Sequence, residues 1–85
     1  MYDLKFSKQA KKFIEKRDAK TRKQFKNVFL KLAENPYRDD LDVKKMKNAD
    51  AFRLRIGKYR FIYTIDNDKV LIVVEKGDSR GDVYK

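Results

Sequence analysis

The stretch Ala51-Phe52-Arg53-Leu54-Arg55-Ile56-Gly57-Lys58-Tyr59-Arg60-Phe61-Ile62-Tyr63 decides how this chain folds. Apolar residues alternate with other residues on both sides of Gly57-Lys58, which is the period-two pattern of half-buried strands. Glycine tolerates a positive φ, so Gly57-Lys58 can form the tight turn of an antiparallel hairpin. The predicted cross-strand pairs are Ile56 with Tyr59, Arg55 with Arg60, and Arg53 with Ile62.

This hairpin separates its side chains into two faces. The apolar face is predicted to contain Phe52, Leu54, Ile56, Tyr59, Phe61 and Tyr63. Arg53, Arg55 and Arg60 share the other face. Like charges directly opposite each other destabilise a sheet, so converging arginines call for a counter-charge. A polyanion would supply it, because guanidinium binds phosphate in a bidentate manner. A solvated face whose charges are spread apart or paired with carboxylates is the alternative.

The composition limits the classes of function. Residues 1–85 are enough for a single domain with one modest core. No run is long enough to cross a bilayer, and no signal peptide follows Met1. Cysteine and histidine are absent, which argues against the usual transition-metal sites, Ser-His dyads and thiolate nucleophiles. We therefore expect a cytoplasmic protein without a metal or cofactor, whose acid–base chemistry falls to Tyr, Asp, Glu, Lys or Arg.

The charge balance points to an anionic partner. The net charge is +10, and the segment from Ser7 to Ala33 holds ten Lys and Arg against only two acidic residues. Such an excess favours attraction to a polyanion over mere solubility. The lysines predicted to bind RNA or the ribosome are Lys11, Lys12 and Lys23 in this segment, and Lys44, Lys45 and Lys47 nearer the hairpin. A solvated loop explains the second group equally well.

The segments before the hairpin predict a strand and two helices. Tyr2–Phe6 alternates as a short strand, and Ser7 can cap a helix that runs to about Arg17. Thr21 and Gln24 form a capping box for a second helix, which Asn35-Pro36 ends. The apolar stripe of that helix consists of Phe25, Val28, Phe29, Leu32 and Ala33.

After the second helix, 37–50 is predicted to be a polar connector. Asp66-Asn67-Asp68 predicts a turn, and 69–75 a last strand covered on much of both faces. The expected fold is thus a small single α+β domain. It has an N-terminal strand, an antiparallel helix pair and a three-strand antiparallel meander, with the helices packed on one sheet face. The first strand joins the edge of the meander, and the arginine face stays open.

This order of elements and two motifs resemble the RelE/ParE toxin superfamily over nearly the whole chain. The first motif, Arg-x-Arg-x-Gly-x-Tyr-Arg-x-x-Tyr, spans 53–63, and the second is the ending Arg80-Gly81-Asp82-Val83-Tyr84. The resemblance implies the toxin of a prokaryotic toxin–antitoxin pair, silenced in a hetero-oligomer with its antitoxin and monomeric when free. RelE-type members cleave mRNA in the ribosomal A site without a metal ion. ParE-type members share the fold but poison DNA gyrase.

The resemblance also assigns site residues. Carried over by position, the catalytic residues are Arg53, Arg55, Arg60, Arg80 and Tyr84. Ser79 stands where the family often has a histidine, and Gly81 replaces one member of its usual Arg-Arg pair.

The chemistry of RNA cleavage can be tested against these residues. Cleavage needs a base for the 2′-hydroxyl, neutralisation of the developing phosphate charge and a proton for the 5′-oxygen. Tyr84 would need the nearby arginines to lower its pKa before it could act as a base, and it could instead only anchor the chain end. Arg80 would stabilise the leaving oxygen.

Three readings follow. The first is a ribosome-dependent mRNA endoribonuclease. The alternatives are a gyrase poison of the ParE type and a non-catalytic basic module that binds RNA or the ribosome.

Overall fold

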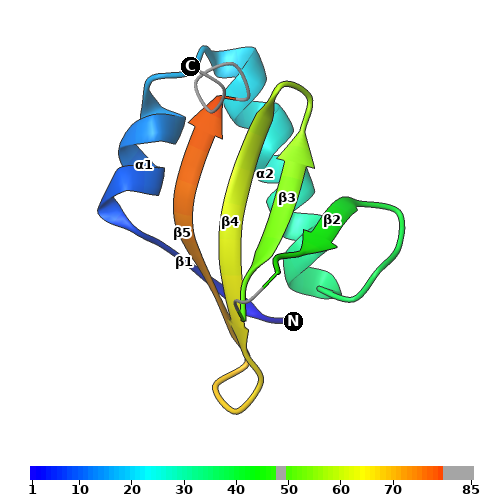
Figure 1. Cartoon of the computed structure of the whole chain (residues 1–85). Coiled ribbons are helices and arrows are strands. Elements are labelled where there is room, and N and C mark those ends of the chain that lie inside the picture. Colours follow the sequence, from blue (N-terminus) through cyan, green and yellow to red (C-terminus); the bar gives the residue numbers. More distant parts are fainter. Residues whose placement is uncertain (48–49, 80–85) are drawn as a thin grey trace.

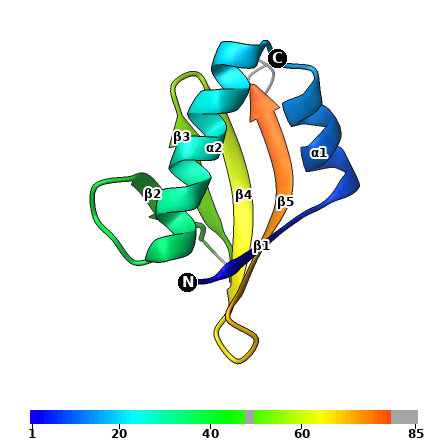
Figure 2. The same cartoon turned by 180° about the vertical axis from the view of Figure 1, so that it is seen from behind.

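The computed structural model describes residues 1–47 and 50–79, which form a small α+β domain. The elements are β1 (Asp3–Phe6), α1 (Lys8–Glu15), α2 (Ala19–Glu34), β2 (Asp42–Lys45), β3 (Phe52–Ile56), β4 (Tyr59–Asp66) and β5 (Leu71–Ser79). In the described part of the chain the sheet has five strands in the order β1-β5-β4-β3-β2. The predicted class is confirmed: both helices lie on one face of the sheet, and the other face is open (Figure 1, Figure 2).

The central hairpin has the predicted register. Arg55 lies opposite Arg60, Arg53 opposite Ile62 and Ile56 opposite Tyr59. Gly57 takes φ 61°, in the left-handed region that the turn requires. The face predicted to be apolar enters the core, where Leu54, Ile56, Phe61 and Tyr63 are buried and Phe52 and Tyr59 are half-buried.

The helices provide the other side of that core. Phe25, Phe29, Leu32 and Ala33 of α2 and Ala10 of α1 are buried against the sheet. Phe61 makes edge-to-face contacts with Phe13, Phe25 and Phe29, at centroid distances of 5.8, 5.0 and 5.0 Å. Such contacts add specific geometry to the burial of apolar area. The predicted stripe of α2 is therefore the face that packs.

The helix boundaries differ from the prediction at one cap. Ser7 caps α1 as expected, and its hydroxyl oxygen accepts from the Ala10 amide at 3.1 Å. The prediction that a capping box at Thr21 opens the second helix is wrong. Asp18 is the N-cap, and its Oδ1 accepts from the Thr21 amide at 3.1 Å. Aspartate caps at least as well as threonine and comes earlier in the chain, so α2 begins at Ala19.

Two sheet predictions also needed correction. The segment 37–50 is not merely a connector, because Asp42–Lys45 forms β2, paired antiparallel with β3. Its strand pattern is weak, since only Val43 among its four residues is apolar. The last strand was predicted over 69–75, but it runs from Leu71 to Ser79. A register shift beside Ile62/Tyr63 lets β5 continue along β4 to its end.

The first strand joins the sheet edge as predicted. β1 pairs with β5 in parallel, with Asp3 opposite Leu71 and Phe6 opposite Val74. The order β1-β5-β4 leaves the arginine-bearing strands β3 and β4 in the interior of the sheet, where their side chains are held by neighbours on both sides. Within the described residues, no helix is long and apolar enough to span a membrane.

Candidate functional site

The open face of the sheet carries a grid of charged side chains. Residues directly opposite each other in an antiparallel ladder point to the same side. The register therefore places Asp42, Arg55, Arg60 and Asp78 in one row across β2, β3, β4 and β5. A second row contains Lys44, Arg53, Ile62 and Lys76. These eight residues are called the open-face grid below.

A cleft of about 530 Å³ lies at the β2 side of this grid. The residues that line it are Lys44, Lys45, Met46, Lys47, Arg53, Arg60 and Ile62. Among the residues that the structure describes, the lining contains five cationic side chains and none that is acidic. We call it the basic cleft. Its composition suits a chain of phosphates, since several cations converge on one hollow.

Arg53 and Arg60 enter the cleft with unused hydrogen-bonding capacity. The Nε atom of each is buried and finds no acceptor among residues 1–47 and 50–79. A buried donor without a partner costs free energy, and each such group calls for an explanation. Both arginines therefore line the cleft while each retains a donor that no described residue satisfies.

Arg55 is placed differently from the other two arginines. Its Nε lies 3.5 Å from Asp42 Oδ2, and it is not among the described residues that line the cleft. The sequence grouped three arginines on one face, and the structure confirms the shared face. Of the three, only Arg53 and Arg60 line the cleft. The third, Arg55, pairs with Asp42 of β2.

The lysines predicted to bind RNA fall into two separate groups. Lys44, Lys45 and Lys47 line the basic cleft. Lys11 and Lys12 on α1 and Lys23 on α2 are exposed on the helix layer, which covers the opposite face of the sheet (Figure 2). One phosphate cannot contact both groups, so the helix lysines are not part of the cleft.

The remaining predicted catalytic residues, Arg80 and Tyr84, lie outside the described residues. The residue missed by the sequence analysis is Asp78, which the register places directly opposite Arg60. Its Oδ2 lies 3.5 Å from Lys76 Nζ. Alternation along β5 is the signal that could have found it, but the predicted strand stopped before this position.

The tyrosines of the hairpin have structural roles. Tyr63 is fully buried, and burial raises the pKa of its phenol to about 12, with a smaller contribution from Tyr37. Tyr59 packs edge-to-face on Phe25, with centroids 5.3 Å apart, and on Phe13 at 5.8 Å. Both rings therefore belong to the core side, as the sequence indicated.

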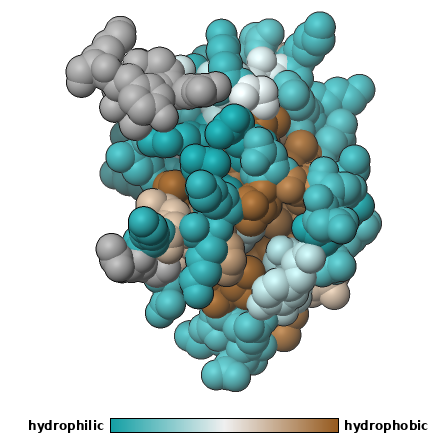
Figure 3. Space-filling model, turned by 45° about the vertical axis from the view of Figure 1, so that its right-hand side comes forward, coloured by the Kyte–Doolittle hydropathy of each residue, from teal (hydrophilic) through white to brown (hydrophobic). Residues whose placement is uncertain are grey.

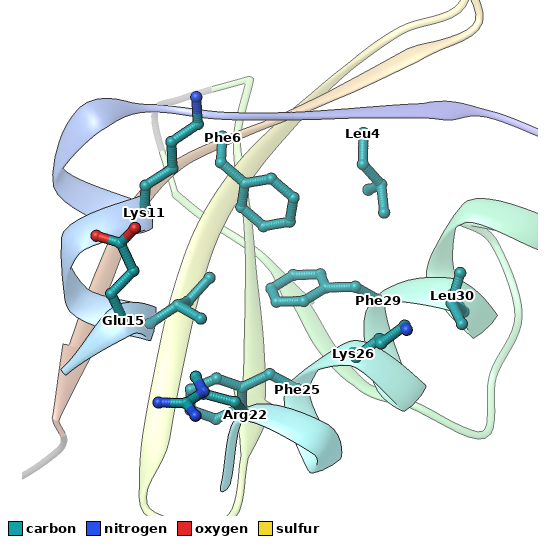
Figure 4. A pocket seen from close by; sticks show the side chains of 10 residues that line it. Leu4, Phe6, Lys11, Glu15, Arg22, Phe25, Lys26, Phe29 and Leu30 are labelled. Carbon is teal, nitrogen blue, oxygen red and sulfur yellow. The ribbon is translucent and has the colours of Figure 1, made fainter. Parts of the chain in front are cut away.

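A second, apolar hollow lies between α1, α2 and β1. It encloses about 340 Å³ and is lined by Leu4, Phe6, Lys11, Ile14, Glu15, Arg22, Phe25, Lys26, Phe29 and Leu30. Figure 4 shows the aromatic and aliphatic side chains grouped in the hollow and Lys11, Arg22 and Lys26 around it. We call it the helix groove.

Hydrophobic surface is also visible outside the core. Figure 3 shows a strip of it framed by hydrophilic side chains. On the open face, Ile62, Leu71 and Val73 are half-buried. Of these, Ile62 lies directly opposite Arg53, so the surface beside that arginine is partly apolar and can support the non-ionic parts of a ligand.

Comparison with known proteins gives consistent relatives. The model of the ParE toxin of type II toxin–antitoxin systems matches residues 4–81. A protein named as a RelE toxin in Methanocaldococcus jannaschii is 35% identical over 65 residues, which is 74% of this chain and 72% of that protein. A protein of Escherichia coli named as a RelE-like toxin is 31% identical over 98% of this chain and 90% of its own length.

Solved structures agree on the fold. The archaeal RelE–RelB complex of Pyrococcus horikoshii superposes with a TM-score of 0.83 at 28% identity, covering 94% of this chain and 96% of that chain. The toxin–antitoxin complex RelBE of Escherichia coli superposes with a TM-score of 0.79 at 23% identity, covering 93% and 96%.

Proposed function

Because the chain belongs to the RelE/ParE superfamily of type II toxin–antitoxin toxins, we propose that it is a ribosome-dependent endoribonuclease. It would cut mRNA in the A site without a metal ion and so inhibit translation in the cytoplasm. The observation that carries the proposal is the basic cleft, which Arg53 and Arg60 line together with three lysines, and in which each arginine has a buried Nε without an acceptor among the described residues.

The cleft supports binding of an RNA backbone. The phosphates on either side of the scissile bond are held by the ammonium groups of Lys44, Lys45 and Lys47, which act as mobile point charges. Arg53 and Arg60 bind the scissile phosphate itself, because their planar guanidinium groups can donate two parallel hydrogen bonds. Both are held by a strand pair in the interior of the sheet, so little reorganisation is needed when charge develops.

Proton transfer requires further groups beside the cleft. Arg80 and Tyr84 follow the last described residue of β5, Ser79, in the chain. We assign both to the leaving oxygen, which Arg80 would stabilise by its charge and Tyr84 would protonate. Arg55 serves this site indirectly, since its pair with Asp42 limits the repulsion between Arg55 and Arg60 across the hairpin.

The proposal includes an antitoxin as partner, in a hetero-oligomer that forms from a free monomer. The helix groove suits an amphipathic helix with acidic flanks, because apolar residues fill its middle and its charged lining is mainly basic. That charged lining consists of Lys11, Arg22, Lys26 and Glu15. Leu30 on this surface is 44% exposed, so its burial would contribute to binding. Leu30→Lys should weaken binding of an acidic antitoxin helix while leaving mRNA cleavage intact.

The cleavage proposal is tested by primer extension on mRNA from a translating cell-free system. Wild type should produce discrete cuts at A-site codons, and Arg60→Ala and Tyr84→Phe should remove them. Arg22→Ala, which removes the same charge from the helix layer, is the matched control and should still cut. Wild type that arrests growth without cutting any mRNA would reject the proposal.

A gyrase poison of the ParE type is the second candidate. Two observations favour keeping it: the family model that matches 4–81 is that of ParE, and the chain contains no histidine. A supercoiling assay with purified gyrase separates the two, since a poison would block supercoiling without ribosomes. A chain that neither cuts mRNA nor inhibits gyrase, yet binds ribosomes, would be the non-catalytic basic module.

A further inference from the structure

The first row of the open-face grid has an acidic residue at each end. Asp42, Arg55, Arg60 and Asp78 lie side by side across β2, β3, β4 and β5. Two carboxylates that flank two arginines are expected to form an ion pair with the arginine next to each. The structure shows this only at one end of the row.

The two carboxylates are used differently. Asp42 pairs with its neighbouring arginine, with Oδ2 3.5 Å from Arg55 Nε. Asp78 instead directs its Oδ2 to Lys76 Nζ at 3.5 Å, and within the described residues it forms no ion pair with Arg60. Arg60 thus keeps its guanidinium for the cleft while a carboxylate stands beside it on the next strand.

We propose that Asp78 is a catalytic residue of the RNA-cleaving site, the general base that removes the proton from the attacking 2′-hydroxyl. The proposal rests on the ribonuclease function above and names one group of that same site. The register carries it: a ribose that extends toward β5 from a phosphate bound by Arg60 would meet Asp78, the side chain directly opposite Arg60 on that strand. The Asp78 side chain is 26% exposed, so the carboxylate is accessible to a ligand.

The cleavage step balances with this assignment. The Asp78 carboxylate accepts the 2′-hydroxyl proton as the 2′-oxygen forms a bond to phosphorus. The bond between phosphorus and the 5′-oxygen breaks, and that oxygen takes a proton from the general acid of the site. The products are a 2′,3′-cyclic phosphate and a 5′-hydroxyl end, and no oxidant, reductant or metal is consumed.

Asp78 also resolves a difficulty with Tyr84 as the base. A free phenol has a pKa of about 10, so it must first be deprotonated before it can accept a proton. With Asp78 as the base, Tyr84 does not have to be deprotonated before cleavage begins. Lys76 then orients the carboxylate by its ion pair.

The test compares three single variants on ribosomes programmed with one mRNA, measuring the single-turnover cleavage rate and the affinity for the ribosome. Asp78→Asn keeps the shape of the side chain but cannot accept the proton. Glu75→Gln removes an exposed carboxylate of the same strand that lies outside the open-face grid. Asp78→Glu restores a carboxylate one methylene further out.

The two explanations predict opposite signs for Asp78→Asn. If Asp78 only reduces the positive charge of the site, removing its carboxylate should strengthen binding to the ribosome. The cleavage rate should then be equal to that of wild type or faster. A general base contributes about 10²–10⁴-fold, so we expect Asp78→Asn to cleave about 100-fold slower or worse at unchanged or tighter binding. Glu75→Gln should stay within about threefold of wild type, and Asp78→Glu should recover part of the rate.

The outcomes separate this proposal from the function on which it rests. Wild type that cuts while Asp78→Asn cuts equally fast overturns the role of Asp78 and leaves the ribonuclease intact. Wild type that never cuts overturns the ribonuclease itself. Thermal unfolding of each variant shows whether a lost rate reflects lost folding, and a folded Asp78→Asn that binds but does not cut supports the proposal.

Discussion

The side-chain amide of Gln9 pairs with the backbone of Gly77 as a neighbouring strand would. Its Nε2 donates to the Gly77 carbonyl at 2.8 Å, and its Oε1 accepts from the Gly77 amide at 2.8 Å. β1 pairs with β5 only from Leu71 to Val74, and the Ser7 hydroxyl donates to the Glu75 carbonyl at 2.6 Å. The start of α1 therefore continues the edge of β5 where β1 ends.

This relationship predicts a stability effect. Gln9→Ala leaves the amide and the carbonyl of Gly77 without partners, and such a loss costs about 1–3 kcal/mol. Urea unfolding should show that decrease in the free energy of unfolding. Gln24→Ala, an exposed glutamine on α2, is the control and should change stability far less. Equal effects of the two variants would contradict the pairing as a source of stability.

Gly77 is also required for space. A Cβ at this position would lie 2.7 Å from Phe13 Cδ2 and 2.8 Å from Phe61 Cε1. Gly77→Ala should therefore cost about 1–3 kcal/mol by overpacking, and Phe13→Leu in the same chain should recover part of it. Gly57→Ala meets no atom within 4 Å but has φ +61°. Its cost, about 1–2 kcal/mol of backbone strain, should not respond to Phe13→Leu.

Because only two of the three open-face arginines line the basic cleft, we expect their substitutions to have unequal effects on RNA cleavage. Arg53→Ala and Arg60→Ala each remove a donor that lines the basic cleft, and we expect cleavage to fall by about 100-fold, as for loss of one electrostatic contact to the transition state. Arg55→Ala removes a group already paired with Asp42 and should cost about tenfold or less. Binding measured against salt should lose about one unit of slope for each phosphate contact removed. Three equal losses would contradict the division.

Tyr63 predicts a loss of stability in alkali. Its folded pKa is raised to about 12 by burial, while an unfolded tyrosine titrates near ~10. Because the folded pKa is the higher one, the stability linked to this proton is complete below pH ~10 and is lost as the pH rises toward 12. Tyr63→Phe should flatten this part of the stability curve and leave cleavage unchanged. Since the Tyr63 hydroxyl finds no partner in the described residues, the variant should be as stable as wild type or more so at neutral pH.

The features that depend only on residues close together in the sequence could be predicted from it. Alternation over 52–63 and the glycine at Gly57 define a hairpin and its register locally, so the pairing of Arg55 with Arg60 was confirmed. The stripe of α2 repeats every three to four residues, which identifies its buried face without knowledge of the partner. Ser7 caps the start of α1 and Asn35 caps the end of α2, each through a hydrogen bond made within one turn.

Only the tertiary structure decided how the charges of the open face are used. β2 has a single apolar residue and gains its strand conformation from hydrogen bonds to β3, and through it Asp42 reaches Arg55. A register shift beside Tyr63 carries β5 onward, and this brings Asp78 opposite Arg60. Both relations join residues far apart in the chain, and local patterns cannot encode them. Two arginines lie in a cleft and a third is neutralised because of the order and offset of strands, which the folded sheet alone determines.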